Sequence, residues 1–151
     1  MNQLHPEPGP WEEYVEEFIQ VNLGSGQWGA HVKEFWSLKQ ERNILYILYE
    51  DMLENPKREI RKVMKFLGKD LSDDDLERIC LHTSFKAMKE NPTTNYTTIP
   101  SSILDQSASP FMRKGICGDW KNHFTASQSE KFDEYYQKQM SGTDLSFRFL
   151  V

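Results

Sequence analysis

Two adjacent cations and a glycine, Arg113, Lys114 and Gly115, lie within residues 111–121, which read Phe-Met-Arg-Lys-Gly-Ile-Cys-Gly-Asp-Trp-Lys. The guanidinium of Arg113 presents a planar fork of N–H donors that matches the oxygens of a phosphate, and Lys114 adds a point charge. Gly115 lets the backbone approach a ligand closely, and Gly118 permits a tight turn. An isolated Arg-Lys-Gly triplet is usually solvated surface, so its role depends on what the rest of the chain places around it.

The composition limits the classes of protein that the chain can belong to. Its 151 residues, 38% of them hydrophobic, suit one domain with a packed core. The net charge of −5 argues against a nucleic-acid surface over the whole molecule. Cys80 and Cys117 have no metal-ligand spacing, which favours a reduced, intracellular protein without a bound metal. No signal-type or bilayer-spanning run is present, so we expect a cytoplasmic protein and no membrane partner.

Helical spacing of apolar residues dominates the first forty residues. A stripe at positions i, i+3, i+4, i+7 and i+8 predicts a helix that begins after Pro10. The stripe consists of Trp11, Tyr14, Val15, Phe18 and Ile19. Glycines at 22–29 interrupt the pattern, and a second helix is expected over 30–41, with Val32, Phe35 and Trp36 buried.

Capping patterns predict the later helices. Asn55 followed by Pro56 begins a helix that Gly68 closes, with apolar residues inward at Ile60, Val63, Met64 and Leu67. Residues 72–75 cap a helix that reaches about residue 81, and Thr83 or Ser84 caps a short helix that ends before Asn91. A long polar loop follows over 92–110. Residues 125–128 form a capping box for a last helix that reaches residue 140.

One clear strand is expected at residues 44–49, Ile-Leu-Tyr-Ile-Leu-Tyr. The run is apolar without alternation, which is typical of a strand covered on both faces in a parallel sheet. Residues 145–149 alternate weakly, and no second run of the first kind is present. The partner strands are therefore expected in another chain or in a larger domain of which this sequence is a piece.

Several further segments, on both sides of the Arg-Lys-Gly run, also match the motifs of one known family. They include Pro-Trp-Glu-Glu-Tyr at 10–14, Leu-Tyr-Glu-Asp-Met at 48–52, Asn-Pro-Lys at 55–57, Thr-Ser-Phe at 83–85, Asn-Pro at 91–92 and Ser-Pro-Phe at 109–111. Together they resemble the C-terminal half of the cytosolic sulfotransferases, which use 3′-phosphoadenosine 5′-phosphosulfate (PAPS). The resemblance covers essentially the whole chain. It implies an α/β fold: the C-terminal half of a P-loop-like parallel-sheet sulfotransferase domain over 1–151, mostly helical, with the buried strand 44–49.

The resemblance also implies a set of PAPS-binding residues. Tyr49 corresponds to a tyrosine near the adenine, and Thr83, Ser84 and Phe85 match the Thr-Ser-Phe that lines the adenine pocket. From the residues alone, a core tyrosine is the alternative for Tyr49, and Thr83 could cap a helix while it also lines the pocket. The run from Phe111 to Gly115 matches the segment that grips the 3′-phosphate and the adenosine. The whole implied set is Tyr49, Thr83, Ser84, Phe85, Phe111, Met112, Arg113, Lys114 and Gly115.

The resemblance also implies residues of an acceptor site and of a dimer interface, and the dimer motif departs from the family's pattern at one position. Tyr96, Ile103 and Leu104 fall in the loop that covers the acceptor pocket in the family. Lys121, Thr125 and Glu130 match the family's dimerisation motif, Lys-x-x-x-Thr-Val-x-x-x-Glu, except that Ala126 stands where Val is usual. Two lost methyl groups weaken the expected homodimer by about 1 kcal/mol or more. An ordinary cap and helix surface is the alternative for this motif.

The family's 5′-phosphosulfate loop and catalytic His have no counterpart here, so we assign no catalytic residue. His5, His31, His82 and His123 match none of the family's catalytic positions. In the complete enzyme, PAPS would sulfate a small phenol, alcohol or amine, and this chain would supply the 3′-phosphate and adenine grip and the acceptor lid. The alternative is a catalytically inactive truncated isoform that binds nucleotide or pairs with other subunits. An unrelated helical scaffold is a third option.

Overall fold

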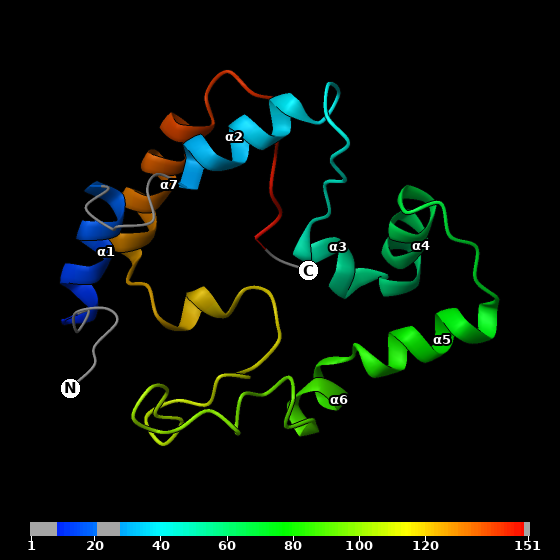
Figure 1. Ribbon diagram of the computed structural model, residues 1–151. Coiled ribbons are helices and arrows are strands. Elements are labelled where there is room, and N and C mark those ends of the chain that lie inside the picture. Colours follow the sequence, from blue (N-terminus) through cyan, green and yellow to red (C-terminus); the bar gives the residue numbers. More distant parts are fainter. Residues whose placement is uncertain (1–8, 21–27, 150–151) are drawn as a thin grey trace. The chain divides into compact units, whose positions relative to one another are not determined.

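The computed structural model describes residues 9–20 and 28–149, and all their regular secondary structure is helical (Figure 1). The helices are α1 (Trp11–Gln20), α2 (Trp28–Leu38), α3 (Tyr49–Glu54), α4 (Pro56–Phe66), α5 (Asp73–His82), α6 (Phe85–Glu90), the 3₁₀ helix η1 (Asp119–Asn122) and α7 (Ala126–Met140). The described residues divide into two compact units. We call Tyr49–Cys117 the middle unit, and the described part of residues 9–48 with 118–149 the terminal unit.

The strand predicted at 44–49 is wrong for this structure. Residues 44–48 form neither helix nor strand, and Tyr49 begins α3 instead. All five residues of 44–48 are half-buried. The apolar run therefore does mark a segment that is partly shielded from solvent, although not a strand. A strand also needs a hydrogen-bonded neighbour, and no residue of the described ranges pairs with this segment in a ladder. The α/β class is therefore not seen in the described residues, which are helical.

Helix caps set the boundaries in the middle unit as the sequence predicts. Asn55 Oδ1 accepts a hydrogen bond from Arg58 N at 3.0 Å, and Pro56 is the first residue of α4. Ser72 caps α5 in the same way, accepting from Asp75 N at 3.1 Å. Gly68, with φ +63°, follows the end of α4. These local bonds explain why both helices could be placed from the sequence.

The packing of α4 on its neighbours buries fewer residues than the predicted stripe. Ile60 of α4 and Leu76 of α5 are buried, with 8% and 2% of their surfaces exposed. Leu67, predicted to face inward, is 61% exposed because it lies at the C-cap of α4, beyond the last full turn. Burial in the middle unit is therefore concentrated where α4 meets α3 and α5.

Arg58 of α4 joins this helix to α3 and also pairs with a buried carboxylate of its own helix. Glu59 is fully buried, and its Oε1 accepts a hydrogen bond from Arg58 Nε at 2.6 Å. Lys62 Nζ lies 2.7 Å from Glu59 Oε2. Arg58 Nη2 also lies 3.2 Å from Glu54 Oε2 and 3.5 Å from Asp51 Oδ1, both on α3. Burial by itself would raise the pKa of Glu59, but the bonds from Lys62 and Arg58 outweigh it and lower that pKa.

In the terminal unit, α1 and α2 both pack against α7 (Figure 1). Val32, Met140 and Leu145 form the buried centre, surrounded by partly buried aromatic residues. The capping box of α7 is present: Gln128 N donates to Thr125 Oγ1 at 3.2 Å, and Thr125 N donates to Gln128 Oε1 at 2.9 Å. Helix α7 therefore starts and ends where the sequence predicts.

The second predicted helix needs two corrections. It spans Trp28–Leu38 rather than 30–41, and Phe35 is 44% exposed rather than buried. Val32 is buried and Trp36 is half-buried, so α7 covers one side of α2 while Phe35 faces away from that contact. The predicted glycine break at 22–29 lies largely outside the described residues. None of the described helices is long and apolar enough to cross a membrane.

Candidate functional site

A cleft of about 660 Å³ opens in the middle unit. Its lining comes from the start of α3, the junction between α5 and α6, and residues 111–116. All nine residues of the predicted nucleotide set line it: Tyr49, Thr83, Ser84, Phe85, Phe111, Met112, Arg113, Lys114 and Gly115. Segments that are up to 66 positions apart in the sequence (49 to 115) therefore meet at one cavity.

The junction between α5 and α6 presents two hydroxyl groups to the cleft. Ser84 is the N-cap of α6, and its Oγ accepts from Ala87 N at 3.3 Å and donates to Leu81 O at 2.8 Å. Thr83 closes α5 instead, because its Oγ1 donates to Ile79 O at 2.7 Å. The sequence left open which of the two caps the short helix, and the structure assigns this role to Ser84. A hydroxyl oxygen has two lone pairs, so both groups can still accept a bond from a ligand.

Gly115 fits where no other residue would. Its φ is +63°, and a Cβ atom at this position would lie 2.1 Å from Cδ2 of Phe85. The ring of Phe85 therefore packs directly on the backbone of the Arg-Lys-Gly segment and sets where α6 meets it. Sequence reasoning expected Gly115 to allow close approach of a ligand, and the structure shows close approach of Phe85.

Two exposed cations and the ring of Phe111 complete the cleft wall. Arg113 and Lys114 both line the cleft and are exposed, and Lys89 Nζ lies 3.5 Å from the carbonyl oxygen of Arg113. The ring of Phe111 meets that of Tyr96 edge-on, with 4.4 Å between centroids. The cleft thus combines positive charge, hydroxyl groups and aromatic faces. This combination suits a ligand that carries a phosphate and a flat ring.

The predicted acceptor-loop residues differ in how they relate to the cleft. Tyr96 does not line the cleft, but its ring packs edge-on against that of Phe111, which does. Tyr96 also has φ +58°, an uncommon backbone conformation for a residue with a side chain. Ile103 is 62% exposed and Leu104 is half-buried, and neither lines the cleft. The predicted role of all three in acceptor choice stays a prediction.

The predicted dimer motif lies in the terminal unit. Lys121 belongs to η1, with its Nζ 5.8 Å from the ring centroid of Trp120. Thr125 caps α7, and Glu130 is exposed on that helix. The alternative for this motif, an ordinary helix cap, is therefore present at Thr125. The dimer interface stays a prediction, because Thr125 can cap α7 and also lie in an interface.

Sequence reasoning did not name every residue of the cleft wall. Cys80, Met52 and Met88 also line it. Helical spacing could have found two of them, because Cys80 precedes Thr83 by three residues on α5 and Met88 follows Phe85 by three on α6. Met52 lies three residues after Tyr49 on α3, a helix whose first residue the sequence predicted as strand.

The histidines do not converge on the cleft. His31 and His123 lie in the terminal unit, and His82 ends α5 without lining the cleft. His5 lies outside the described residues. In the part of the chain that the structure describes, no group of three His, Cys, Asp or Glu side chains could hold a metal ion. None of the described residues that line the cleft is a histidine.

Comparison with known proteins gives the chain a family. A model of the sulfotransferase domain matches residues 1–144. Sulfotransferase 1B1 of Canis lupus familiaris is 57% identical over 148 residues, which cover 98% of this chain and 50% of the relative. Sulfotransferase 1A1 of Mus musculus is 53% identical, over 98% of this chain and 51% of its own length. The chain spans about half the length of these curated relatives.

Solved structures agree with the sequence comparison. Mouse sulfotransferase SULT7A1, complexed with PAP, is 32% identical with a TM-score of 0.77, over 92% of this chain and 50% of its own. Retinol dehydratase, in a complex with retinol and PAP, is 27% identical with a TM-score of 0.85, over 95% of this chain and 42% of its own. The chain therefore belongs to the sulfotransferase family, as the Arg-Lys-Gly segment and the stretches around it predicted.

Proposed function

We propose that the cleft of the middle unit holds the adenosine 3′-phosphate end of PAPS. One observation carries this proposal: nine residues chosen from sequence resemblance, on three separate segments, line a single cavity of about 660 Å³. Two structural neighbours, SULT7A1 and retinol dehydratase, were solved with PAP, which supports the ligand class.

Each part of the cleft has a role that its chemistry suits. The aromatic faces of Tyr49, Phe85 and Phe111 offer stacking surfaces for the adenine. Arg113 binds the 3′-phosphate through paired N–H donors, and Lys114 adds positive charge beside it. The residues present thus fit the nucleotide on their own chemistry.

In the complete enzyme, PAPS supplies the sulfuryl group that passes to a hydroxyl or amine of a small acceptor. This chain is the C-terminal half of that enzyme in our proposal. Its residues bind and orient the nucleotide, and the loop with Tyr96, Ile103 and Leu104 covers the acceptor. The edge-on stack of Tyr96 on Phe111 is the contact that supports placing this loop beside the nucleotide.

Titration calorimetry of the 151-residue chain with adenosine 3′,5′-bisphosphate tests the proposal. We expect saturable binding, and at least tenfold weaker binding of adenosine 5′-monophosphate, which lacks the 3′-phosphate. Lys65→Ala, an exposed change on α4 outside the cleft, is the control and leaves the affinity unchanged. Equal affinity for the two nucleotides, or no binding by a chain that is folded by circular dichroism, would contradict the proposed site.

A sulfation assay on the same sample separates the two functional readings. We expect no turnover of PAPS with a phenol, because no catalytic base is assigned to the chain. Turnover would mean that residues of this half supply the missing chemistry. The description of the chain as half of an enzyme would then fail, while the nucleotide site could still stand.

A further inference from the structure

The loop that follows α6 is joined to the cleft wall by one side chain, Gln106. Its Nε2 donates a hydrogen bond to the carbonyl oxygen of Asn95 at 3.1 Å, and its Oε1 accepts one from the backbone N–H of Phe111 at 3.4 Å. Phe111 lines the nucleotide cleft, and Asn95 lies at the start of the loop. One half-buried amide therefore bridges the start of the loop and the cleft wall.

The bridge requires an amide at position 106. The carbonyl oxygen of Asn95 can only accept a hydrogen bond and the N–H of Phe111 can only donate one, so the bridging group must offer a donor and an acceptor side by side. A glutamine amide offers both, whereas an ionised carboxylate only accepts and an ammonium group only donates. The two partners also fix the orientation of the Gln106 amide, because the reverse orientation would face like groups on both sides.

Asn95 is a firm anchor for the bridge, because it is bonded to the end of α6. Its Nδ2 donates to the carbonyl oxygen of Lys89 at 2.8 Å, and its backbone N–H donates to that of Asn91 at 3.0 Å. Thr94 beside it donates from Oγ1 to the carbonyl oxygen of Met88 at 2.6 Å, and Met88 lines the cleft. The start of the loop is thus held to a helix that forms part of the cleft.

Tyr96 has a defined and uncommon backbone conformation beside this anchor. Its φ of +58° costs energy unless the surroundings hold it. The backbone N–H of Thr97 donates to Asn95 Oδ1 at 3.0 Å, which closes a turn around Tyr96. In this conformation the ring of Tyr96 meets that of Phe111, with 4.4 Å between centroids. Gln106 therefore bonds to Phe111 itself and to the residue before Tyr96, on the two sides of one ring contact.

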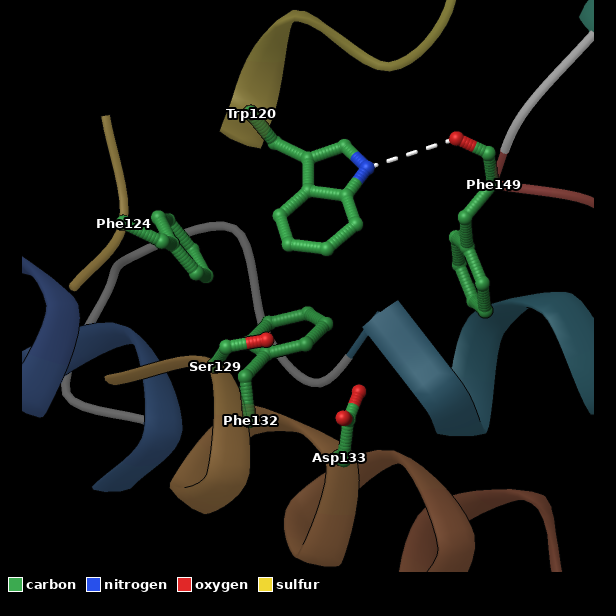
Figure 2. A pocket seen from close by; sticks show the side chains of 6 residues that line it. All are labelled: Trp120, Phe124, Ser129, Phe132, Asp133 and Phe149. Atoms are coloured by element: carbon green, nitrogen blue, oxygen red, sulfur yellow. Dashed lines mark hydrogen bonds between the residues drawn. The ribbon is translucent and has the colours of Figure 1, made fainter. Parts of the chain in front are cut away.

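The terminal unit holds an aromatic ring in a different way. Trp120 Nε1 donates a hydrogen bond to the carbonyl oxygen of Phe149 at 3.3 Å, beside a pocket of about 250 Å³ that both residues line (Figure 2). The ring of Phe111 carries no such N–H group, so a hydrogen bond can hold this residue only through its backbone. Gln106 supplies that bond.

We propose that Gln106 is a positioning residue of the nucleotide site. By tying the backbone of Phe111 to Asn95, it keeps the Phe111 ring against Tyr96 and at the cleft wall, where the ring can stack on a base. The effect on nucleotide binding rests on the proposed function of the cleft. The effect on the ring contact does not, so the two can be tested apart.

Gln106→Met removes the donor and the acceptor while it keeps an unbranched side chain and adds no charge. The matched control is Gln137→Met, the same change at an exposed position of α7. Calorimetry with adenosine 3′,5′-bisphosphate measures both variants of the 151-residue chain. We expect Gln106→Met to weaken binding by about three- to tenfold, because hydrogen bonds are lost, and Gln137→Met to change it less than twofold.

A double-variant cycle separates positioning from general stabilisation of the loop. In a Phe111→Ala background, Gln106→Met should change the affinity less than twofold, because the ring that Gln106 positions is already gone. An equal loss with and without the Phe111 ring would overturn the proposal.

Proton NMR of the chain without nucleotide tests the bridge directly. We expect a nuclear Overhauser contact between the Tyr96 and Phe111 rings that Gln106→Met reduces at least twofold and Gln137→Met leaves unchanged. An unchanged contact in Gln106→Met would overturn the proposal. If the wild-type chain binds no nucleotide, the proposed function of the cleft fails, and the ring contact still decides whether Gln106 positions Phe111.

Discussion

Arg113 and Lys114 are neighbours in the chain, but they differ in how they can bind a phosphate. Arg113 can hold two oxygens with a rigid pair of donors, whereas Lys114 acts as a flexible point charge. Both line the cleft, so proximity does not distinguish them. The distinction is chemical, and it can be measured.

We expect Arg113→Ala to weaken binding of adenosine 3′,5′-bisphosphate by about 10- to 100-fold, the worth of a charge-assisted hydrogen bond. Lys114→Ala should weaken it by about threefold to tenfold. Calorimetry at one fixed salt concentration measures both, with Lys65→Ala as the control. Equal losses in the two variants would count against the assignment of the 3′-phosphate to Arg113.

Gly115 and Gly68 form a natural pair for testing the contact with Phe85. Both have φ +63°, but a Cβ at Gly68 meets no atom within 4 Å, whereas at Gly115 it would lie 2.1 Å from Phe85. Gly68→Ala should cost about 1 kcal/mol of unfolding free energy, from backbone strain alone. Gly115→Ala should cost about 1–3 kcal/mol more, from overpacking, and should weaken nucleotide binding. Urea denaturation measures the free energy of unfolding of both variants. Equal losses would show that the contact between Gly115 and Phe85 does not constrain residue 115.

At the scale of elements, the helix ends follow from local chemistry. Asn55, Ser72, Ser84 and Thr125 each accept a backbone N–H of the helix that they begin. These bonds join residues that are three positions apart, so the local sequence is enough to predict them. Glu59 of α4 is different, because its complete burial is a property of the packed structure that no cap predicts.

We expect Glu59→Gln to lower the free energy of unfolding by about 1.5–3 kcal/mol near neutral pH, since charge-assisted bonds from Arg58 and Lys62 are weakened. The pKa of Glu59 is lowered in the folded chain, so its contribution is fully present above the ordinary value of 4.5. That contribution is lost as the pH falls through the lower, folded pKa. The difference between wild type and variant should therefore shrink in acid.

Urea denaturation at pH 7 and at decreasing pH below 4.5 measures this dependence. Glu90→Gln, an exposed change at the end of α6, is the control and should have little effect. A variant whose stability differs from the wild type by the same amount at every pH would show that the ionised form of Glu59 does not stabilise the fold through its pairs with Arg58 and Lys62.

At the scale of the whole molecule, the dimer motif raises the question of assembly. Ala126 is the first residue of α7, and its side chain is exposed. Ala126→Val restores the family's usual residue and about 1 kcal/mol of apolar burial per copy. Over the two copies of a homodimer this is about 2 kcal/mol, so we expect the change to tighten the dimer by about thirtyfold, as measured by analytical ultracentrifugation. Ser127→Val next to it is the control, and equal effects of the two changes would argue against the motif.

Much of the helical structure and the membership of the cleft could be predicted from the sequence. The stripe of α1, the Asn-Pro start of α4 and the capping box of α7 all depend on residues close together in the chain. The nine predicted nucleotide residues came from motifs, and the structure brings them to one cavity. Their role in binding stays a proposal, which calorimetry decides.

What only the tertiary structure decided depends on partners far away in the chain. Residues 44–48 are apolar and half-buried, as their composition requires, yet a strand needs a neighbour that no local pattern supplies. Phe85 against Gly115 and Phe149 against Trp120 join segments about thirty residues apart, and nothing in either segment names the other. The sequence by itself determined the family, the helix caps and the cations, because these depend on residue type and short spacing. Tertiary structure determined which surfaces meet, because packing depends on contacts between distant residues.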